Sequence, residues 1–316
     1  MVDDDVPIVV LVNPSSSGFT AGILRQVMAV LGNRAAARWP TNRDDTVDMA
    51  ATAGSAGATV VAMGGDGMVH HVARGVVGTA GRLAIVPVGT TNVLARLLGL
   101  PQDPVGAAGV VVDGRTKHIP VGIAAWGSGT GERLERPVLF SLGAGWDAEV
   151  VASAEAEPYR KATGGVRLYL RSTIAQLRRE IGRLPDLDVS APEPAICGPA
   201  IAVQVQLWGA YTFAGPARFR LGEPKEGYLV VANWRRMRAA ALLPITKAAL
   251  ESGGAGTHPD IDVAAVTSVS VEASRPVRLQ IDGEPLGTFL ELDVAVDPRG
   301  LHVVVPSEDA HEKRLR

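Results

Sequence analysis

A glycine-rich loop at residues 64–67, Gly-Gly-Asp-Gly, holds the residues best suited to chemistry in this sequence. It follows the apolar run Val60–Met63 and precedes a segment with helical periodicity. Glycines let a bound group approach the main chain, and the amides at a helix N-terminus favour an anion such as phosphate. A carboxylate beside phosphate, here Asp66, needs a bridging cation or a hydroxyl group from which it accepts a proton. The loop therefore suggests phosphoryl transfer to an alcohol, although an ordinary Gly-Asp-Gly turn is the commoner explanation of such a loop on its own.

The loop matches neither of two widespread nucleotide-binding patterns. It lacks the Gly-Lys-Ser/Thr ending of the Walker loop, and it lacks the G-x-G-x-x-G spacing of the dinucleotide-binding fold. The rest of the chain must therefore show whether a phosphate compound binds here.

Residues 1–116 are expected to supply the elements that position this loop. Apolar strands alternate with helices in this part of the chain, which predicts a doubly wound parallel sheet. The strands are expected at Pro7–Val12, Ala37–Trp39, Thr59–Met63 and Leu83–Val88, with helices beginning near Thr20, after a capping box at Thr41–Asp44, after Asn92 and near Asp103.

Polar loops of small residues follow several of these strands. They are Asn13–Gly18, Gly64–Gly67 and Gly89–Asn92, and Thr41 lies near the end of a further strand. Ligands of doubly wound sheets bind beyond the carboxyl ends of the strands, where such loops converge. This convergence is a stronger argument for a ligand site than any one of the loops.

After Gly114 the pattern changes to short, often alternating strands separated by turn signals, which predicts an antiparallel β-sandwich or meander. We therefore expect an α/β domain at residues 1–116, a β-rich domain at residues 117–305 and a charged tail at residues 306–316. The second domain should hold helices at about 165–181 and 238–251, a hairpin loop at 127–131, and strands at 117–125, 138–142, 201–207, 217–221, 228–231, 262–264, 268–272, 277–281, 289–294 and 301–305.

The composition limits the kinds of partner. A net charge of −2 and a hydrophobic share of 47% describe a globular protein with ample core and no general attraction for nucleic acid. The single cysteine, Cys197, excludes an intramolecular disulfide and favours a reducing compartment. The start, MVDDD, is acidic where a signal peptide is basic, and no apolar run approaches the roughly 20 residues that span a bilayer. We expect a cytoplasmic protein, with any membrane contact peripheral at the inner face.

Several motifs resemble those of the diacylglycerol kinase catalytic-domain family, in the family's order and at suitable spacing. This family includes bacterial diacylglycerol kinases and related lipid kinases, sphingosine kinases and ceramide kinases. The resemblance covers nearly the whole chain. The matching residues are Asn13-Pro14 with Gly18, Thr41, the Gly-Gly-Asp-Gly loop, Pro87–Asn92 (PVGTTN) with Arg96, Ser141–Ala148 (SLGAGWDA) and Ile281–Glu284 (IDGE).

The resemblance implies a nucleotide-binding α/β domain followed by a β-rich lipid kinase domain, with ATP in the cleft between them. The implied reaction transfers the γ-phosphoryl group of ATP to a lipid hydroxyl at a membrane surface, most simply converting diacylglycerol to phosphatidic acid. Mg²⁺ is implied beside ATP because phosphoryl transfer needs charge neutralisation. Glu284 would accept the proton, with Asp66 also essential or itself the base, and a homodimer is left open. The residues implied to bind the nucleotide are Asn13, Pro14, Ser17, Gly18, Thr41, Gly64, Gly65, Asp66, Gly67, Met68, His71, Gly89, Thr90 and Asn92.

The chain departs from the family pattern at some positions. Met68 replaces the Thr that usually follows the loop, and His70-His71 stand where family members often carry Asn-Glu. Val93 replaces a common Asp. Glu226-Gly227 takes the place of the Asp-Gly at a structural Mg²⁺ site of the bacterial enzymes, but Lys225 adjoins it. No metal ligands are therefore assigned.

Two alternatives stay open at this point. An NAD kinase shares a Gly-Gly-Asp-Gly loop, but the sequence lacks the Asn-Glu and Gly-x-x-Gly-Phe motifs of that family. A nucleotide- or lipid-binding protein without catalysis is favoured by Met68 and Val93, whereas the carboxylates of Asp66 and Glu284 argue against it.

Overall fold

The computed structural model describes residues 7–307 except 130, 156–172, 174, 193–195 and 251–253. It divides into two compact units. Unit 1 comprises Met1–Pro120 and Arg299–Arg316, and unit 2 comprises Val121–Pro298. The sequence-based division placed all of residues 117–305 in one domain, whereas the structure assigns the segment from Arg299 onward to unit 1.

The sheet of unit 1 is parallel, as the alternation of strands and helices predicts, and its strand order is β16-β4-β3-β1-β2. The strands are continuous apolar runs because helices cover both faces of the sheet. The core of unit 1 is accordingly rich in valine from β1, β3 and β4. The strands are β1 (Ile8–Val12), β2 (Ala35–Arg38), β3 (Thr59–Gly64), β4 (Arg82–Pro87) and the end of β16 (Glu284–Val305).

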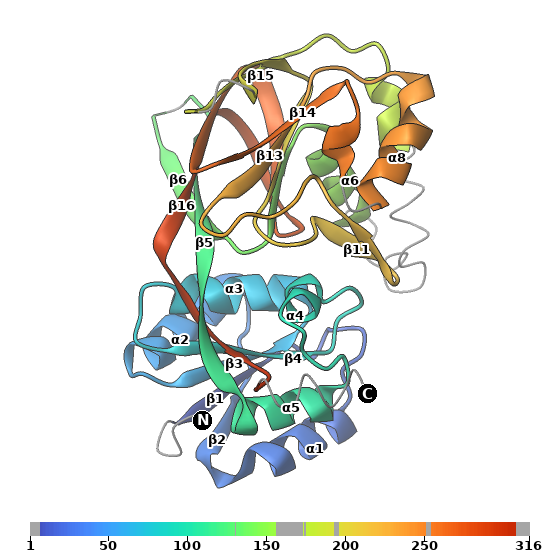
Figure 1. Ribbon diagram of the computed structural model, residues 1–316. Coiled ribbons are helices and arrows are strands. Elements are labelled where there is room, and N and C mark those ends of the chain that lie inside the picture. The colour runs from blue at the N-terminus through green and yellow to red at the C-terminus, as the bar shows by residue number, and fades with distance from the viewer. Residues whose placement is uncertain are drawn as a thin grey trace. The chain divides into compact units, whose positions relative to one another are not determined.

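Helices α1 and α5 pack together on one face of this sheet, and α2 and α3 pack together on the other (Figure 1). Thr20 and Asp103 cap α1 and α5 as N-cap residues. The cap of α2 lies one residue later than predicted, at Asn42, because its side chain accepts the amide of Asp45. The helices are α1 (Ala21–Leu31), α2 (Arg43–Ser55), α3 (Asp66–Val76), α4 (Val93–Leu97) and α5 (Pro104–Asp113).

Unit 2 is rich in antiparallel strands, as predicted, with the order β14-β13-β10-β7-β15-β16. Helix α6 (Trp146–Glu155) follows β7, and α8 (Leu242–Leu250) follows a short 3₁₀ turn, so α8 begins later than the predicted residue 238. The strands that lie wholly or partly in unit 2 are β5 (Arg115–Gly127), β6 (Arg133–Val138), β7 (Ser141–Ala144), β8 (Leu187–Ser190), β9 (Gly198–Ala200), β10 (Ala202–Gln206), β11 (Thr212–Ala214), β12 (Ala217–Phe219), β13 (Leu229–Trp234), β14 (Ile261–Val266), β15 (Ser268–Ile281) and β16.

Some strand predictions need correction. The predicted strand at 138–142 is two strands, β6 and β7, because the intervening amides bond to the carboxylate of Asp282. The predicted pairs 268–272 with 277–281, and 289–294 with 301–305, are single strands, β15 and β16. A register shift in β15 between Glu272 and Val277 accounts for the break in its sequence pattern. Most of the helix predicted at 165–181 and most of the tail at 306–316 lie outside the described residues.

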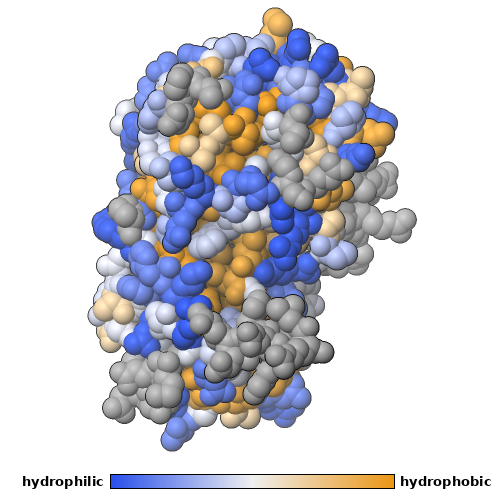
Figure 2. All heavy atoms as spheres, viewed as in Figure 1, coloured by the Kyte–Doolittle hydropathy of each residue, from blue (hydrophilic) through white to orange (hydrophobic). Residues whose placement is uncertain are grey.

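Within the described part of the chain, the helices are too short or too polar to cross a bilayer. Hydrophilic and hydrophobic side chains are interspersed on the face that Figure 2 presents.

Candidate functional site

The loops after β1, β3 and β4 converge in unit 1, as the sequence predicts. Backbone hydrogen bonds join them: the amide of Val88 donates to the carbonyl of Gly64 at 3.0 Å, and the amide of Gly18 donates to the carbonyl of Val88 at 2.9 Å. The amide of Asn13 donates to the carbonyl of Met63 at 3.0 Å. The three loops therefore form one surface at the carboxyl edge of the sheet, where doubly wound proteins bind ligands.

Two glycines allow this close approach. A Cβ atom on Gly89 would lie 2.4 Å from the Cα atom of Gly65, so the loops after β3 and β4 touch backbone to backbone. A Cβ atom on Gly64 would lie 2.4 Å from the Cβ atom of Met68. Met68 itself is 6% exposed, which explains how an apolar residue fits directly after the loop. Its role in this structure is packing against Gly64.

The loop after β3 leads directly into α3. Gly65 is the N-cap residue of α3 and has no side chain, so no side chain caps this helix. In contrast, Thr20, Asn42 and Asp103 cap their helices with side-chain oxygens. Together with the adjoining loops, the N-terminal amides of α3 form a surface that favours an anion.

Asp66 connects the loop after β3 to the start of α4. Its Oδ1 atom accepts a hydrogen bond from the amide of Val93 at 2.6 Å. The side chain is partly buried, in the first turn of α3. A carboxylate in this position is held in one orientation beside the three loops, which suits it to a hydroxyl group or a cation.

Asn92 shapes the loop after β4. Its backbone is left-handed, with φ of 51°, and its side chain bonds to Gly89 twice: Oδ1 accepts from the amide at 3.1 Å, and Nδ2 donates to the carbonyl at 2.9 Å. Asparagine tolerates this backbone better than most residues because it can bond locally in this way. Its side chain is therefore used to set the loop geometry.

Two exposed hydroxyl groups face each other across the converging loops. The Oγ atom of Ser17 and the Oγ1 atom of Thr90 are 3.1 Å apart. The neighbouring Pro14 is exposed, and Asn13 holds the turn through its Oδ1 atom, which accepts from the amide of Ser15 at 3.0 Å. Ser17 and Thr90 are thus the side chains of these loops best placed to donate to a bound phosphate.

Thr41 and His71 have other surroundings. The hydroxyl group of Thr41 donates to Asp45 at 2.9 Å, so it stabilises the start of α2. His71 is 7% exposed in the middle of α3, and its ring lies edge-on to that of the fully buried His70. Gly67 is exposed, and a Cβ atom there would meet open space.

In unit 2, Glu284 follows a tight turn between β15 and β16. Asp282 and Gly283 both have positive φ, 52° and 82°, which is the backbone of a type I′ hairpin turn. The carboxylate of Asp282 accepts the amides of Leu139, Phe140 and Ser141 at 2.9 to 3.1 Å. Glu284 is 7% exposed. Its position is therefore fixed by the turn and by the buried anchor of Asp282.

A polar cluster that the sequence did not indicate lies nearby in unit 2. Tyr211 donates to the Oδ2 atom of Asp147 at 2.6 Å, and Gln280 donates to the same atom at 2.8 Å. Burial raises the pKa of Asp147, and the bonds from Tyr211, Gln280 and Gln204 oppose this shift. Burial and the neighbouring Asp147 carboxylate raise the pKa of Tyr211 well above its ordinary value. Only Asp147 lay in a motif noted in the sequence, SLGAGWDA.

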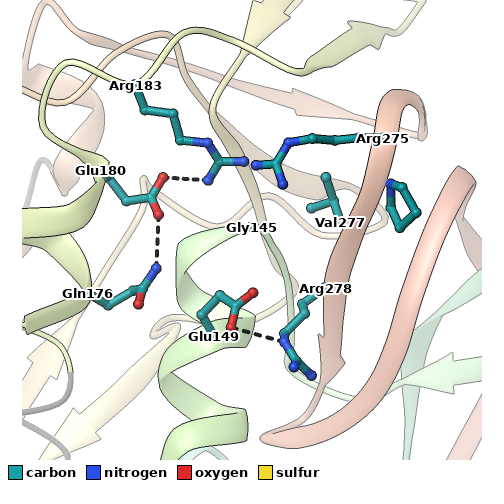
Figure 3. Close-up of a pocket in the computed structure, with 9 residues that line it drawn as sticks. Gly145, Glu149, Gln176, Glu180, Arg183, Arg275, Val277 and Arg278 are labelled. Carbon is teal, nitrogen blue, oxygen red and sulfur yellow. Dashed lines mark hydrogen bonds and ion pairs between the residues drawn. The ribbon is translucent and has the colours of Figure 1, made fainter.

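A pocket of about 240 Å³ in unit 2 is lined by ion pairs (Figure 3). Arg278 pairs with Glu149 at 3.0 Å, and Arg183 pairs with Glu180 at 2.6 Å. Arg275 pairs with Asp186 at 2.6 Å. Since each of these arginines pairs with a carboxylate, the ion pairs connect α6, β15 and the segment around Glu180 at the wall of the pocket.

Comparison with known proteins agrees with this geometry. The model of the diacylglycerol kinase catalytic domain matches residues 7–124, which confirms the family resemblance seen in the sequence. The diacylglycerol kinase of Staphylococcus epidermidis is 24% identical over 249 residues, covering 75% of this chain and 72% of that protein. A Pseudomonas aeruginosa protein named probable lipid kinase YegS-like is 27% identical over 264 residues, covering 79% of this chain and 77% of that protein.

Two further similarities concern length and fold. An uncharacterized Synechocystis protein is 24% identical over 252 residues, covering 79% of this chain but 55% of that protein, so this chain spans about half of that relative. The crystal structure of a diacylglycerol kinase from Bacillus anthracis covers 95% of this chain and 96% of that chain, with a TM-score of 0.68 and 15% identity. This likeness shows that the fold is shared.

Proposed function

Because residues 7–124 belong to the diacylglycerol kinase catalytic-domain family, we propose that this protein transfers the γ-phosphoryl group of ATP to the hydroxyl group of a lipid, most simply diacylglycerol. The observation that carries the proposal is the convergence of three small-residue loops on Gly64–Gly67, joined by backbone hydrogen bonds. Phosphoryl transfer depends mainly on positioning and on charge neutralisation, and a rigid surface of amides supplies both.

In this proposal, unit 1 binds the phosphates of ATP. The amides after Gly65 and the hydroxyl groups of Ser17 and Thr90 donate to the phosphate oxygens. The close contact between Gly65 and Gly89 leaves no side chain between the phosphates and the main chain at this point. Asn92 and Val93 act indirectly, because they fix the loop and the carboxylate of Asp66.

The donor set of these loops fits Mg²⁺. This ion prefers oxygen ligands and is usually held by one or two carboxylates together with substrate phosphates and water. Asp66 offers a carboxylate that the amide of Val93 holds in place. The adjoining hydroxyl and amide side chains carry further oxygen atoms that can serve as metal ligands. When bound, Mg²⁺ would neutralise phosphate charge, and Asp66 would be the residue that holds it.

Glu284 is proposed as the group that accepts the proton of the lipid hydroxyl as the oxygen attacks the γ-phosphorus atom. The bond between that phosphorus and the bridging oxygen of ADP breaks in the same displacement, and ADP leaves with the electron pair. The fixed turn at Asp282 and Gly283 suits this role, because a general base must be held at a constant position. A diacylglycerol acceptor lies in a bilayer, so the reaction would take place at a membrane surface.

The test is phosphoryl transfer from labelled ATP with Mg²⁺ to separate acceptors: diacylglycerol, monoacylglycerol, sphingoid base, ceramide and NAD. We expect label in a lipid, and its loss in Asp66→Ala and Glu284→Gln. Glu291→Gln is the matched control, since Glu291 lies on the same strand as Glu284 but is exposed. Label in NADP instead would overturn the proposal, and so would ATP binding without transfer to any acceptor.

A further inference from the structure

Three residues form a row across neighbouring strands of unit 2. Gln204 of β10 pairs with Gly143 of β7, and Gly143 pairs in turn with Gln280 of β15. Residues directly opposite each other in an antiparallel sheet place their side chains on the same face. On one face, the row therefore carries two glutamine side chains with an empty position between them, at Gly143.

Asp147 and Tyr211 occupy the space above Gly143. A Cβ atom on Gly143 would lie 2.1 Å from the Oδ2 atom of Asp147 and 2.7 Å from the hydroxyl oxygen of Tyr211. Gln204 lowers the pKa of both groups, in opposition to the effect of burial. The glycine is thus required at this position so that a carboxylate and a phenol can insert between the two glutamines.

The hydrogen bonds give Gln280 one orientation. Its Oε1 atom accepts from the amide of Gly283 at 2.8 Å, so its Nε2 atom must point the other way. Nε2 donates to the Oδ2 atom of Asp147 at 2.8 Å and to the hydroxyl oxygen of Tyr211 at 2.9 Å. The hydroxyl group of Tyr211 donates to the same Oδ2 atom at 2.6 Å. Every donor in this triangle meets an acceptor.

Gln280 therefore connects the buried triangle to the turn that carries Glu284. Gln280 is 2% exposed, and it accepts a hydrogen bond from the amide of Gly283, the residue immediately before Glu284. The backbone of Gly283 has φ of 82°, a conformation that glycine adopts without strain but does not enforce by itself. An additional hydrogen bond at this amide restricts the turn to one geometry.

We propose that Asp147, Tyr211 and Gln280 are positioning residues for Glu284: the carboxylate and the phenol fix the side-chain amide of Gln280, and Gln280 fixes the turn. This inference rests on the proposed function, in which Glu284 accepts the proton of the acceptor hydroxyl. Misplacement of a reacting group by about 1 Å can cost about a hundredfold in rate. Hydrogen bonds in a buried network of this kind hold the side chain of Gln280 more rigidly than hydrogen bonds exposed to solvent would.

The first experiment removes the connection and then rebuilds it. Gln280→Met keeps the length of the side chain but removes both the donor and the acceptor. The double variant Asp147→Asn with Gln280→Glu exchanges the amide and the carboxylate. Its glutamate can accept from Gly283 and from Tyr211, and its asparagine can donate to the glutamate, so the bonds are retained with roles reversed. Tyr211→Phe is a milder variant that removes one hydroxyl group.

Two measurements are made on each variant: kcat and KM for lipid phosphorylation, and hydrogen exchange at the amide of Gly283. We expect Gln280→Met to lower kcat by about a hundredfold with KM for ATP unchanged, and to speed exchange by about tenfold. The double variant Asp147→Asn with Gln280→Glu should restore both the kcat and the slow hydrogen exchange at Gly283. Gln206→Met is the control, because Gln206 is also buried in β10 but bonds to Leu221 and Gly222, away from the turn.

The proposal is overturned if Gln280→Met leaves the hydrogen exchange of the Gly283 amide unchanged. It is overturned equally if the kcat of the double variant is as low as that of Gln280→Met. It is also overturned if Gln206→Met lowers kcat to the same extent, since the effect would then reflect general loss of stability. Failure of the proposed function looks different: the wild-type protein would phosphorylate no lipid, while the exchange measurement would still decide whether Gln280 orders the turn.

Discussion

The carboxylate of Asp66 accepts a hydrogen bond from the backbone amide of Val93 at 2.6 Å, across 27 positions of sequence. Val93 is the first residue of α4, and its N-cap residue, Asn92, provides no side-chain cap. Asp66 therefore serves as the cap of a helix to which it does not belong, in a position where a negative charge is favourable. The same side chain holds two loops together and is the acid on which the proposed chemistry depends.

Asp66→Asn should separate these two roles. The side-chain oxygen of asparagine can still accept from Val93, so the free energy of unfolding should fall by less than about 1 kcal/mol, whereas Asp66→Ala should cost about 1–3 kcal/mol. Both variants should lose phosphoryl transfer. Urea unfolding and the labelled-ATP assay measure the two effects. Wild-type activity in Asp66→Asn would contradict the assignment of Asp66 to the reaction.

Gly89→Ala should weaken ATP binding and stability together. The new Cβ atom would lie 2.4 Å from the Cα atom of Gly65, and backbone atoms cannot move aside as a flexible side chain can. We expect a loss of about 1–3 kcal/mol in the free energy of unfolding, with a higher Kd for ATP by calorimetry. Gly109→Ala is the matched control, because Gly109 lies in α5 and not in the converging loops, its Cβ atom would meet open space, and alanine favours a helix by about 0.5–1 kcal/mol. Equal effects of the two substitutions would contradict the close contact between the loops.

Asp282→Gly should show what the buried carboxylate contributes without straining the backbone. Glycine accepts the φ of 52° at this position, but the amides of Leu139, Phe140 and Ser141 lose their shared acceptor. A buried donor without an acceptor costs about 1–3 kcal/mol, so the total loss should exceed the cost of removing one ordinary hydrogen bond. Asp282→Asn retains one oxygen acceptor and tolerates the backbone, so it should be less destabilised. Chemical unfolding decides the order of the two variants.

Asp147→Asn should become more stable relative to the wild type as the pH rises. Burial raises the pKa of Asp147 above its ordinary value of 3.8, so the folded state holds its proton to higher pH than the unfolded state does. The stability of the wild type therefore falls as pH increases from 3.8 through the folded pKa, and the penalty is complete above it. Asparagine at this position has no such dependence. The measurement is the free energy of unfolding of both proteins at several pH values. A difference in this free energy that stays constant with pH would contradict the prediction.

Local sequence signals were sufficient for much of this structure. Apolar runs buried on both faces, such as Ile8–Val12, identify the parallel strands without further information. The Asp-Gly pair at 282–283 identifies a tight hairpin turn, since both residues tolerate positive φ. The glycines of the loop at 64–67 indicate a close approach of backbone segments. Each of these features is encoded within a few consecutive residues.

The buried cluster could not be anticipated in this way. Tyr211 lies 64 positions from Asp147, and Gln280 lies 133 positions from it, so no local pattern joins them. The anchor of Asp282 reaches back 143 positions to Leu139, and it is the reason that β6 and β7 are separate strands. The burial of His71 in α3 is likewise not revealed by the polar character of histidine.

Unit 1 is built from two separate parts of the chain, and this has a consequence for biosynthesis. Val303, near the end of β16, pairs in parallel with Leu83 of β4. During translation, β1 to β4 leave the ribosome long before that strand does, so the sheet is completed only after the whole of unit 2 has been made. Until then, β4 presents a sheet edge that can pair with other chains, and efficient production of the protein depends on the late arrival of this strand.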